Sequence, residues 1–453
     1  MRCGFFESEI TPPLGASMYG YGVTRLASGL RSRLYAKAAV LETEDGLVAM
    51  LAVDAETLPA GILETVRERV SRYTTILPKN ILVAATHSHT SGPIRADGGL
   101  YRGIKVKGNE LVADELLDDL ALRTTAMKAA DAIILAWQRL RPAVVRFGNE
   151  NVEGISFVRQ YILRDGSVRT NPKRADIDRP YANPDTHLPV LFFTTPEGDP
   201  LGAITSFALH HDTDTDKKSD SDISADYSGY VSRELHRHFG EDFVTVFFSG
   251  FCGNINHFNY GGTVFAMPSK EIGGAVSQKL LDAIHSAELT HGPVCSLRKT
   301  VHIPKRRLEP GFLDRVKYLL KNPPSEGQAV SIANPDSDLF KYSRGPAIVE
   351  FFDTDNRERY PMDVQVIRVG DCLICAVPWE IFSQFGEKIR NELLTDKIIL
   401  VSMANNDTSQ GYIPTPELFL PTVYESSVAS AKLDPSAGDM LADAIISLGR
   451  QLA

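Results

Sequence analysis

The sequence predicts a mixed α/β (α+β) fold in which large mixed β-sheets are flanked by helices. Short runs of β-branched and aromatic residues alternate with amphipathic segments along most of the chain. The composition, 43% hydrophobic and 23% charged, is ordinary for a globular protein and excludes disordered, collagenous and coiled-coil classes. This alternation over 453 residues is typical of an enzyme with sizeable sheets.

The individual elements follow from the period of the apolar residues. Apolar runs of strand length predict strands at 34–41, 47–53, 80–85, 144–147, 190–193, 204–209, 243–248, 364–369, 372–377 and 398–402. Helical spacing predicts helices at 59–73, 115–140, 228–238, 269–287, 310–321, 380–394 and 438–448. The polar stretch 322–345 contains adjacent prolines and glycine, which indicates a loop or lid excursion. No internal sequence repeat is visible, and one domain spanning 1–453 is expected.

Charge and hydropathy restrict the partners and the compartment. The chain has 48 Lys+Arg against 57 Asp+Glu, a net charge of −9, and no basic stripe, so nucleic-acid binding is excluded. Glu7 and Glu9 lie where a signal peptide would be uncharged, and no run reaches the roughly 18 apolar residues of a membrane span. We therefore expect a cytoplasmic protein with a small-molecule substrate and no stable membrane association. A homo-oligomer is compatible with the sequence.

The five cysteines do not form a disulfide or zinc-knuckle framework. They are odd in number and widely spaced, which is typical of reduced thiols. Cys372 and Cys375 have CxxC spacing but lie within an apolar run, where strand geometry directs the two thiols to opposite faces. Structural burial is favoured over metal or redox use.

Two expected strands end in histidine. The strand at 80–85 runs into His87 and His89, and a Thr-Ser-Gly-Pro loop follows. One imidazole of such a pair can bind a metal while the other faces a substrate, because strand ends commonly hold sites in α/β folds. The strand at 204–209 ends in the same way at His210, before the acidic loop 212–222. That loop lacks the glycine and the terminal glutamate of a calcium loop, so a solvated loop is favoured.

A third strand, at 372–377, is followed by Pro378 and then Glu380. The carboxylate either supplies a favourable charge at the start of a helix or completes a His87, His210, Glu380 metal set. Widely separated ligands at strand ends resemble a catalytic zinc site with an open coordination position. Structural zinc would instead favour compact Cys/His knuckles.

The ordered motifs resemble the neutral/alkaline non-lysosomal ceramidase family, in the N-terminal catalytic domain. Each motif is short, but together they span almost the whole chain. They are SEITPPLG at 8–15, MYGY at 18–21, LYAKA at 34–38, ATHSHTSGP at 85–93, FALH at 207–210, SADYSG at 224–229, GNIN at 253–256, PWE at 378–380, and GYIPT at 411–415 leading to Tyr424.

The resemblance implies a ceramidase catalytic-domain fold and one Zn²⁺ per chain. It implies metal coordination by His87, His210, Glu380 and Tyr412, although Tyr412 is an unusual zinc ligand and could instead bond to bound water. It implies that His89, Tyr424 and Arg159 surround the reacting carbonyl. Zinc lowers the pKa of bound water from 15.7 to about 7, which suits hydrolysis of an amide or ester at neutral pH.

The sequence also departs from the family pattern. The family's GDVSPN stretch is replaced by 252–257 (CGNINH), the loop after His210 is acidic, and the C-terminal immunoglobulin-like domain of the larger ceramidases is not expected here. No exposed apolar stretch suggests a cradle for lipid chains. We therefore expect a zinc-dependent hydrolase that cleaves an amide, ester or lactone bond of a smaller, more polar substrate.

Two other enzyme classes stay open, together with a binding module that lacks turnover. Ser224, close to Asp226, could be the nucleophile of a serine amidase, although capping of the following helix is favoured. A His/His/Glu metal site could also serve an isomerase or epimerase of a sugar acid. His257 follows the GNIN motif and could approach the same pocket.

Overall fold

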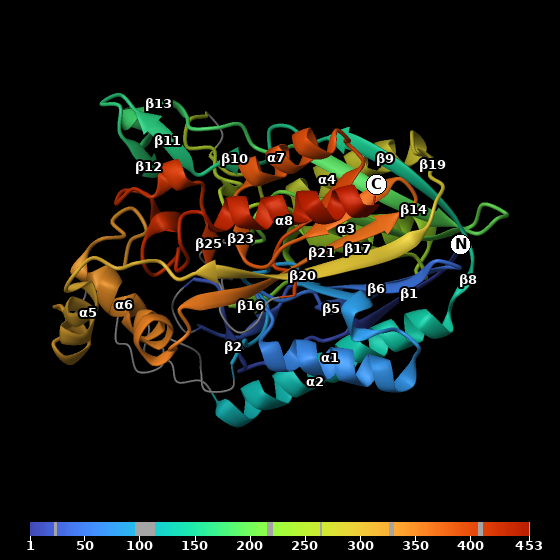
Figure 1. The fold of residues 1–453 in the computed structure, drawn as a ribbon, viewed down its shortest axis with the longest axis horizontal. Coiled ribbons are helices and arrows are strands. Elements are labelled where there is room, and N and C mark those ends of the chain that lie inside the picture. The colour runs from blue at the N-terminus through green and yellow to red at the C-terminus, as the bar shows by residue number, and fades with distance from the viewer. Residues whose placement is uncertain are drawn as a thin grey trace.

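Three β-sheets form the centre of the molecule (Figure 1). The computed structural model describes residues 1–21, 25–95, 114–214, 221–262, 265–325, 330–405 and 411–452. The first sheet has the order β7-β6-β5-β1-β8, with bounds β1 Arg2–Glu9, β5 Tyr35–Thr43, β6 Gly46–Val53, β7 Ile81–Ala85 and β8 Arg141–Pro142. The second has the order β17-β15-β14-β9-β19, with bounds β9 Val144–Asn151, β14 His187–Thr194, β15 Pro200–Phe207, β17 Val244–Ser249 and β19 Glu288–Leu289. The third has the order β20-β21-β22-β24, with bounds β20 Val294–Pro304, β21 Arg359–Val369, β22 Cys372–Ala376 and β24 Ile398–Val401.

A pair of helices covers the outer face of each sheet. These pairs are α1 Ala60–Tyr73 with α2 Glu115–Gln138, α3 Asp226–Phe239 with α4 Ser269–His285, and α7 Ser383–Leu393 with α8 Ala437–Leu452. Two more helices, α5 Phe312–Lys321 and α6 Asp338–Val349, lie together at one end of the molecule (Figure 1). Short strands complete the described part: β2 Ser17–Met18, β3 Arg25–Leu26, β4 Gly29–Leu30, β10 Phe157–Val158, β11 Gln160–Leu163, β12 Val168–Thr170, β13 Ile177–Pro180, β16 Asp222–Ile223, β18 Ile255–Asn256, β23 Glu380–Ile381 and β25 Tyr412–Ile413.

The three sheets repeat one order of elements. Each has three antiparallel strands in sequence, then a helix, a strand parallel to the third, and a second helix. The parallel pairs are β6/β7, β15/β17 and β22/β24, and they are connected by α1, α3 and α7. The chain therefore contains a threefold structural repeat that its sequence does not show.

Alternation of side chains along each strand builds a shared core between the sheets. In β6, Ala49, Leu51 and Val53 pack beneath α1 and α2, whereas Val48, Met50 and Ala52 join a core that receives side chains from all three sheets. The outer faces of the second and third sheets bury similar residues against α3/α4 and α7/α8. This layering positions the carboxyl ends of three strands around one point.

The predicted fold class is confirmed, and each predicted strand and helix overlaps an observed one. The sequence prediction missed β1, β20 and α6, and α6 begins inside the stretch 322–345 that was expected to be a loop or lid. Residues 326–329 of that stretch lie outside the described residues. The helix expected from 380 begins at Ser383, because Glu380 and Ile381 instead form β23 beside β25.

The two thiols of the CxxC sequence lie on opposite faces of β22, as expected. Cys375 packs with the α7/α8 side, whereas Cys372 lies in the core shared by the sheets. Burial raises the pKa of Cys375 to about 12, and burial also raises the pKa of Cys372 well above its usual range. The pair is structural.

Native protein at pH 8 is therefore expected to react rapidly with a thiol reagent at Cys295 alone. Cys295 is partly exposed, whereas the other four cysteines are buried and become reactive only after unfolding. Ellman titration with and without denaturant measures this difference, and Cys295→Ser is the control that removes the fast phase. Rapid reaction of two or more native thiols would contradict this assignment.

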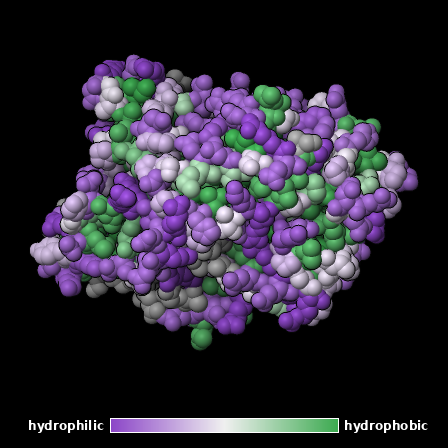
Figure 2. Space-filling view, viewed as in Figure 1, coloured by the Kyte–Doolittle hydropathy of each residue, from purple (hydrophilic) through white to green (hydrophobic). Residues whose placement is uncertain are grey.

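Within the described ranges, none of the helices is both long and apolar enough to cross a membrane. On the face shown in Figure 2, hydrophilic residues predominate and hydrophobic ones gather in several separate patches.

Candidate active site

The candidate ligands follow the ends of strands from all three sheets, but not of equivalent strands, because β7 is the fourth strand of its repeat and β15 and β22 are the third strands of theirs. His87 and His89 follow β7, His210 follows β15, and Glu380 follows β22. All four side chains are buried, and His87 and His210 are each 1% exposed. Because each strand runs toward the same central point, residues up to 293 positions apart (380 − 87) meet in space.

The atoms of this set converge as metal ligands do. His87 Nε2 lies 3.2 Å from His210 Nε2, and the Glu380 Oε2 atom lies 3.2 Å from each of these nitrogens. Tetrahedral ligands about 2.0–2.2 Å from a zinc ion are separated by about 3.2–3.6 Å, so the spacing fits one ion.

The outer ring nitrogens of both histidines are held by backbone carbonyls. His87 Nδ1 donates to the Glu56 carbonyl at 2.9 Å, and His210 Nδ1 donates to the Cys252 carbonyl at 3.1 Å. Since a carbonyl only accepts, each Nδ1 carries the proton and each neutral ring presents an Nε2 lone pair to the centre. Two lone pairs and a carboxylate repel one another unless a cation lies between them. The residues therefore fit a divalent metal.

The pKa values of His87, His210 and Glu380 also indicate that this set of side chains favours a positive charge at its centre. Burial lowers the pKa of His87, but the Glu380 carboxylate outweighs burial and raises the pKa above its usual 6.5. The pKa of His210 is raised further, because its hydrogen bonds to Cys252 and Glu380 outweigh burial. Burial raises the pKa of Glu380, but the two imidazoles outweigh this effect and hold the pKa well below 4.5. These directions show that the Glu380 carboxylate favours a positive charge between it and the two imidazoles.

Left-handed backbone conformations place two of these side chains. His87 has φ 68°, and Trp379, directly before Glu380, has φ 66°. For residues other than glycine such conformations cost about 1–3 kcal/mol and persist only where surrounding packing imposes them. Trp379 is fully buried, so the packing of its indole ring helps to fix the direction of the neighbouring carboxylate.

His89 differs from the two carbonyl-bound histidines. Its Nε2 lies 3.3 Å from His87 Nε2, and the three imidazoles together place donor atoms within 4.8 Å. Its Nδ1 has no hydrogen-bond partner among the described residues, so its tautomer is not fixed by a carbonyl. Burial lowers the pKa of His89 well below 6.5, and the neighbouring His87 and His210 add to this effect. A neutral ring that can exchange its proton suits acid–base work, so we favour Glu380 over His89 as the third ligand.

Pairing of two short strands places the Tyr412 phenol beside His210 of the candidate ligand set. In the parallel β23/β25 pair, Glu380 lies opposite Tyr412, which places the phenol oxygen 3.5 Å from His210 Nε2. Burial raises the pKa of Tyr412 well above 10, and the Glu380 charge raises it further, so the phenol keeps its proton here. Arg159 Nη1 donates to the Tyr412 oxygen at 3.0 Å.

Arg159 and Tyr424 complete the predicted group. Arg159 is buried, its Nε lies 3.1 Å from Glu425 Oε1, and its guanidinium lies 5.7 Å from the ring centres of both Tyr412 and Tyr424. Tyr424, at the start of the 3₁₀ turn Tyr424–Ser426, lines a cavity of about 510 Å³ together with His87, His89, Glu380 and Tyr412. All seven predicted site residues therefore lie together. The sequence analysis missed Glu425, which holds Arg159.

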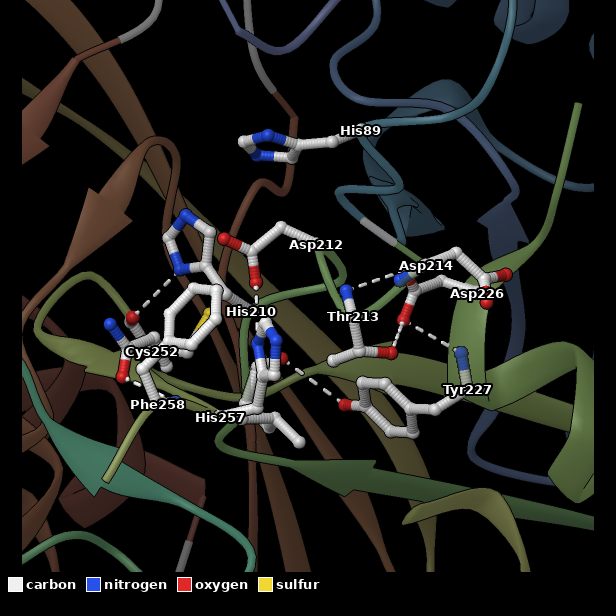
Figure 3. A network of polar contacts seen from close by, with 12 residues as sticks. His89, His210, Asp212, Thr213, Asp214, Asp226, Tyr227, Cys252, His257 and Phe258 are labelled. Carbon is white, nitrogen blue, oxygen red and sulfur yellow. Dashed lines mark hydrogen bonds and ion pairs between the residues drawn. The ribbon is translucent and has the colours of Figure 1, made fainter. Parts of the chain in front are cut away.

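The acidic loop after His210 is not a solvated loop where it is described. Asp212 lies between His89, His210 and His257 (Figure 3), and its Oδ1 lies 3.3 Å from His257 Nδ1. Asp214 is buried and ion-pairs with Arg31. Residues 215–220 lie outside the described residues. The solvated interpretation is thus wrong for Asp212 and Asp214, because Asp212 contacts the buried His257 ring and Asp214 is itself buried against Arg31.

Ser224 lacks the partner that a serine nucleophile needs. Its Oγ bonds to Asp214 and accepts the Asp226 N–H at 3.0 Å, at the first turn of α3. Among the described contacts of its hydroxyl no imidazole occurs. The position supports the helix-start role, although Ala225 rather than Ser224 is the N-cap residue.

Two imidazoles and a carboxylate, buried at the converging strand ends of an α/β fold beside a cavity, form a set of the kind that holds a catalytic metal. The model of the family "Neutral/alkaline non-lysosomal ceramidase, N-terminal" matches residues 2–271, and the chain belongs to this family. The family prediction is confirmed, as is the prediction of a hydrolase acting on carbon–nitrogen (amide) or ester bonds.

Known relatives are similar over almost the whole chain. The neutral ceramidase of Drosophila pseudoobscura pseudoobscura is 21% identical over 531 residues, covering 94% of this chain and 71% of that protein. The crystal structure of neutral ceramidase from Pseudomonas aeruginosa has a TM-score of 0.72 at 19% identity, covering all of this chain and 74% of the other. A ceramidase complexed with C2 has a TM-score of 0.73 at 18% identity, covering all of this chain and 75% of the other. These structures share the fold, including the third sheet that lies beyond the family match.

Proposed function

We propose that the chain is a zinc-dependent hydrolase that cleaves the amide bond of ceramide or a close N-acyl relative. The observation that carries the proposal is the convergence of His87 Nε2, His210 Nε2 and Glu380 Oε2 beside the cavity. Mixed nitrogen and oxygen donors in a closely spaced set suit zinc. The named relatives are ceramidases, so the comparisons favour an N-acyl lipid over the smaller polar substrate expected from the sequence.

His87, His210 and Glu380 would hold the ion, with the Tyr412 phenol beside them. When bound, zinc supplies a water of lowered pKa and polarises the substrate carbonyl. The Glu56 and Cys252 carbonyls orient the two imidazoles, so the ligand geometry exists before substrate arrives.

The remaining residues move protons and bind the carbonyl. His89 is neutral near pH 7, so its ring can accept a proton and return it to the leaving amine. The Tyr424 phenol lines the cavity and can donate to the developing oxyanion, while Arg159 holds Tyr412 in place. Glu425 balances the buried charge of Arg159.

Removing the metal is expected to abolish amide hydrolysis. Protein dialysed against a strong chelator should lose turnover of a short-chain ceramide and regain it when zinc is added. Ser224→Ala is the matched control, because its hydroxyl lies outside the ligand set. We expect this variant to keep the metal dependence and most of the activity. Full activity of metal-free protein, or loss of chemistry in Ser224→Ala with its fold intact, would overturn the proposal in favour of a serine amidase.

No described contact favours the isomerase alternative. The cytoplasmic location, the single domain over 1–453, the lid at 322–345 and the assembly state stay predictions.

A further inference from the structure

The connection between the first and the second strand is long in each of the three sheets. These connections are 10–34 before β5, 152–186 before β14 and 305–358 before β21. Residues of the first and third connections line the cavity, among them Gly20 and Ala347. The second connection contains β11, β12 and β13, which form a small sheet at one end of the molecule (Figure 1). Arg159 directly precedes β11 and reaches Tyr412 of the cavity wall, so each sheet contributes its long connection to the surroundings of the candidate site.

Thr170, the last residue of β12, connects this small sheet to the segment that carries Tyr424. Its side chain is fully buried. Its hydroxyl donates to Glu425 Oε2 at 2.6 Å and accepts the Tyr424 N–H at 3.1 Å. Because a carboxylate only accepts and a backbone N–H only donates, the hydroxyl cannot rotate without losing one of these two bonds. One hydroxyl therefore holds two adjacent residues of the candidate site.

The Glu425 carboxylate extends the influence of this hydroxyl to Arg159. Its Oε1 atom lies 3.1 Å from Arg159 Nε, while its Oε2 atom accepts the Thr170 hydroxyl, and the side chain is fully buried. The guanidinium in turn donates to the Tyr412 phenol at 3.0 Å. Thr170 therefore acts on Arg159 through the carboxylate and on Tyr424 through the backbone.

The main chain around Thr170 is held by contacts that do not use its hydroxyl. Thr170 pairs with Gln160 in the β11/β12 ladder. The Thr422 hydroxyl donates to the Val168 carbonyl at 2.5 Å, and the Asn171 N–H donates to the carbonyl of the residue before β11 at 2.8 Å. Loss of the Thr170 hydroxyl should therefore redirect side chains without displacing the strand.

We propose that Thr170 is a positioning residue that fixes the Tyr424 phenol and the Arg159 guanidinium relative to the bound carbonyl. This inference rests on the proposed amide hydrolysis, in which the Tyr424 phenol donates to the developing oxyanion. Such a donor is effective only when it is held in the right geometry before the reaction. Among the described contacts of Thr170 none reaches the His87, His210, Glu380 set, so its effect falls on kcat and not on metal binding.

Thr170→Val and Thr170→Ser test the hydroxyl with zinc-loaded protein and a short-chain ceramide. Valine keeps the branched shape without the hydroxyl, whereas serine keeps the hydroxyl. We expect Thr170→Val to lower kcat about ten- to a hundredfold, with a smaller change in KM and full metal content. Thr170→Ser should recover most of kcat.

Thr205→Val is the matched control. Thr205 is a fully buried strand threonine whose hydroxyl donates to the Pro189 carbonyl at 2.7 Å, so its loss removes a comparable hydrogen bond away from Tyr424 and Arg159. We expect this variant to keep its kcat. Equal losses of kcat in the two valine variants, or a Thr170→Ser variant as slow as Thr170→Val, would overturn the proposal.

Failure of the proposed function would be visible separately. Protein labelled with fluorotyrosine gives a fluorine NMR resonance for Tyr424, which is identified by its loss in Tyr424→Phe. Even if no ceramide is hydrolysed, Thr170→Val should shift or broaden this resonance, and Thr170→Ser should restore it. An unchanged Tyr424 resonance in Thr170→Val refutes the positioning role. If the valine variant does not fold, Thr170→Ala removes the same hydroxyl and gives the same comparisons.

Discussion

Replacing His210 by alanine is expected to remove the bound metal and to lower kcat/KM by about 10³-fold or more. The Nε2 of His210 lies 3.2 Å from both other proposed ligand atoms, so its loss leaves one imidazole and one carboxylate. Metal-assisted stabilisation of several kcal/mol corresponds to a rate factor of this size. Elemental analysis of the purified variant and its kcat/KM on short-chain ceramide measure the two effects.

The adjacent His211 offers a matched control. Its ring stacks on Tyr227 with centres 4.3 Å apart, and neither ring nitrogen has a hydrogen-bond partner among the described residues. His211→Leu removes a buried imidazole without removing a ligand, so metal content and stability should be retained. Full metal content in His210→Ala, or loss of metal in His211→Leu, would refute the ligand assignment.

Replacing His89 by glutamine should lower kcat by about 10²–10³-fold while the metal stays bound. Glutamine occupies a similar volume but cannot accept and return a proton at neutral pH. Because the third ligand is assigned to Glu380, the metal content should not change. Pre-steady-state kinetics together with elemental analysis separate lost chemistry from lost metal.

The comparison variant is Glu380→Gln, which keeps size and removes charge. It should lose the metal, because only the carboxylate places an anionic oxygen 3.2 Å from both imidazoles. The opposite pattern, with metal lost in His89→Gln and retained in Glu380→Gln, would show that the three histidines are the ligands.

The sequence predicted the fold class and the strand ends because both depend on local patterns. An apolar strand that ends in His87 or His210 is visible without knowledge of the tertiary fold. Tyr412 and Tyr424 were predicted as site residues from the family motifs alone. The contact of Tyr412 with the centre depends on the β23/β25 register, which joins residues 32 positions apart (412 − 380).

Other parts of the site depend on long-range packing and could not be predicted. The Asp212–His257 pair joins two loops through burial, although the acidic composition had indicated solvent exposure. Arg344 and Ala347 of α6 line the cavity, but the sequence of α6 contains glycine and an internal proline and so does not indicate a helix. The threefold repeat is not visible in the sequence, because the three sheets share the order of their strands and helices but no recognisable sequence motif.

The repeat has a consequence for the newly made chain. The donors arrive in the order His87, His210 and Glu380, one from each sheet. During synthesis the amino-terminal sheets can form first, and they then hold two imidazoles without the carboxylate. A growing chain therefore has no complete hydrolytic centre until its third sheet has folded against the other two, so catalytic competence is itself a readout of completed folding.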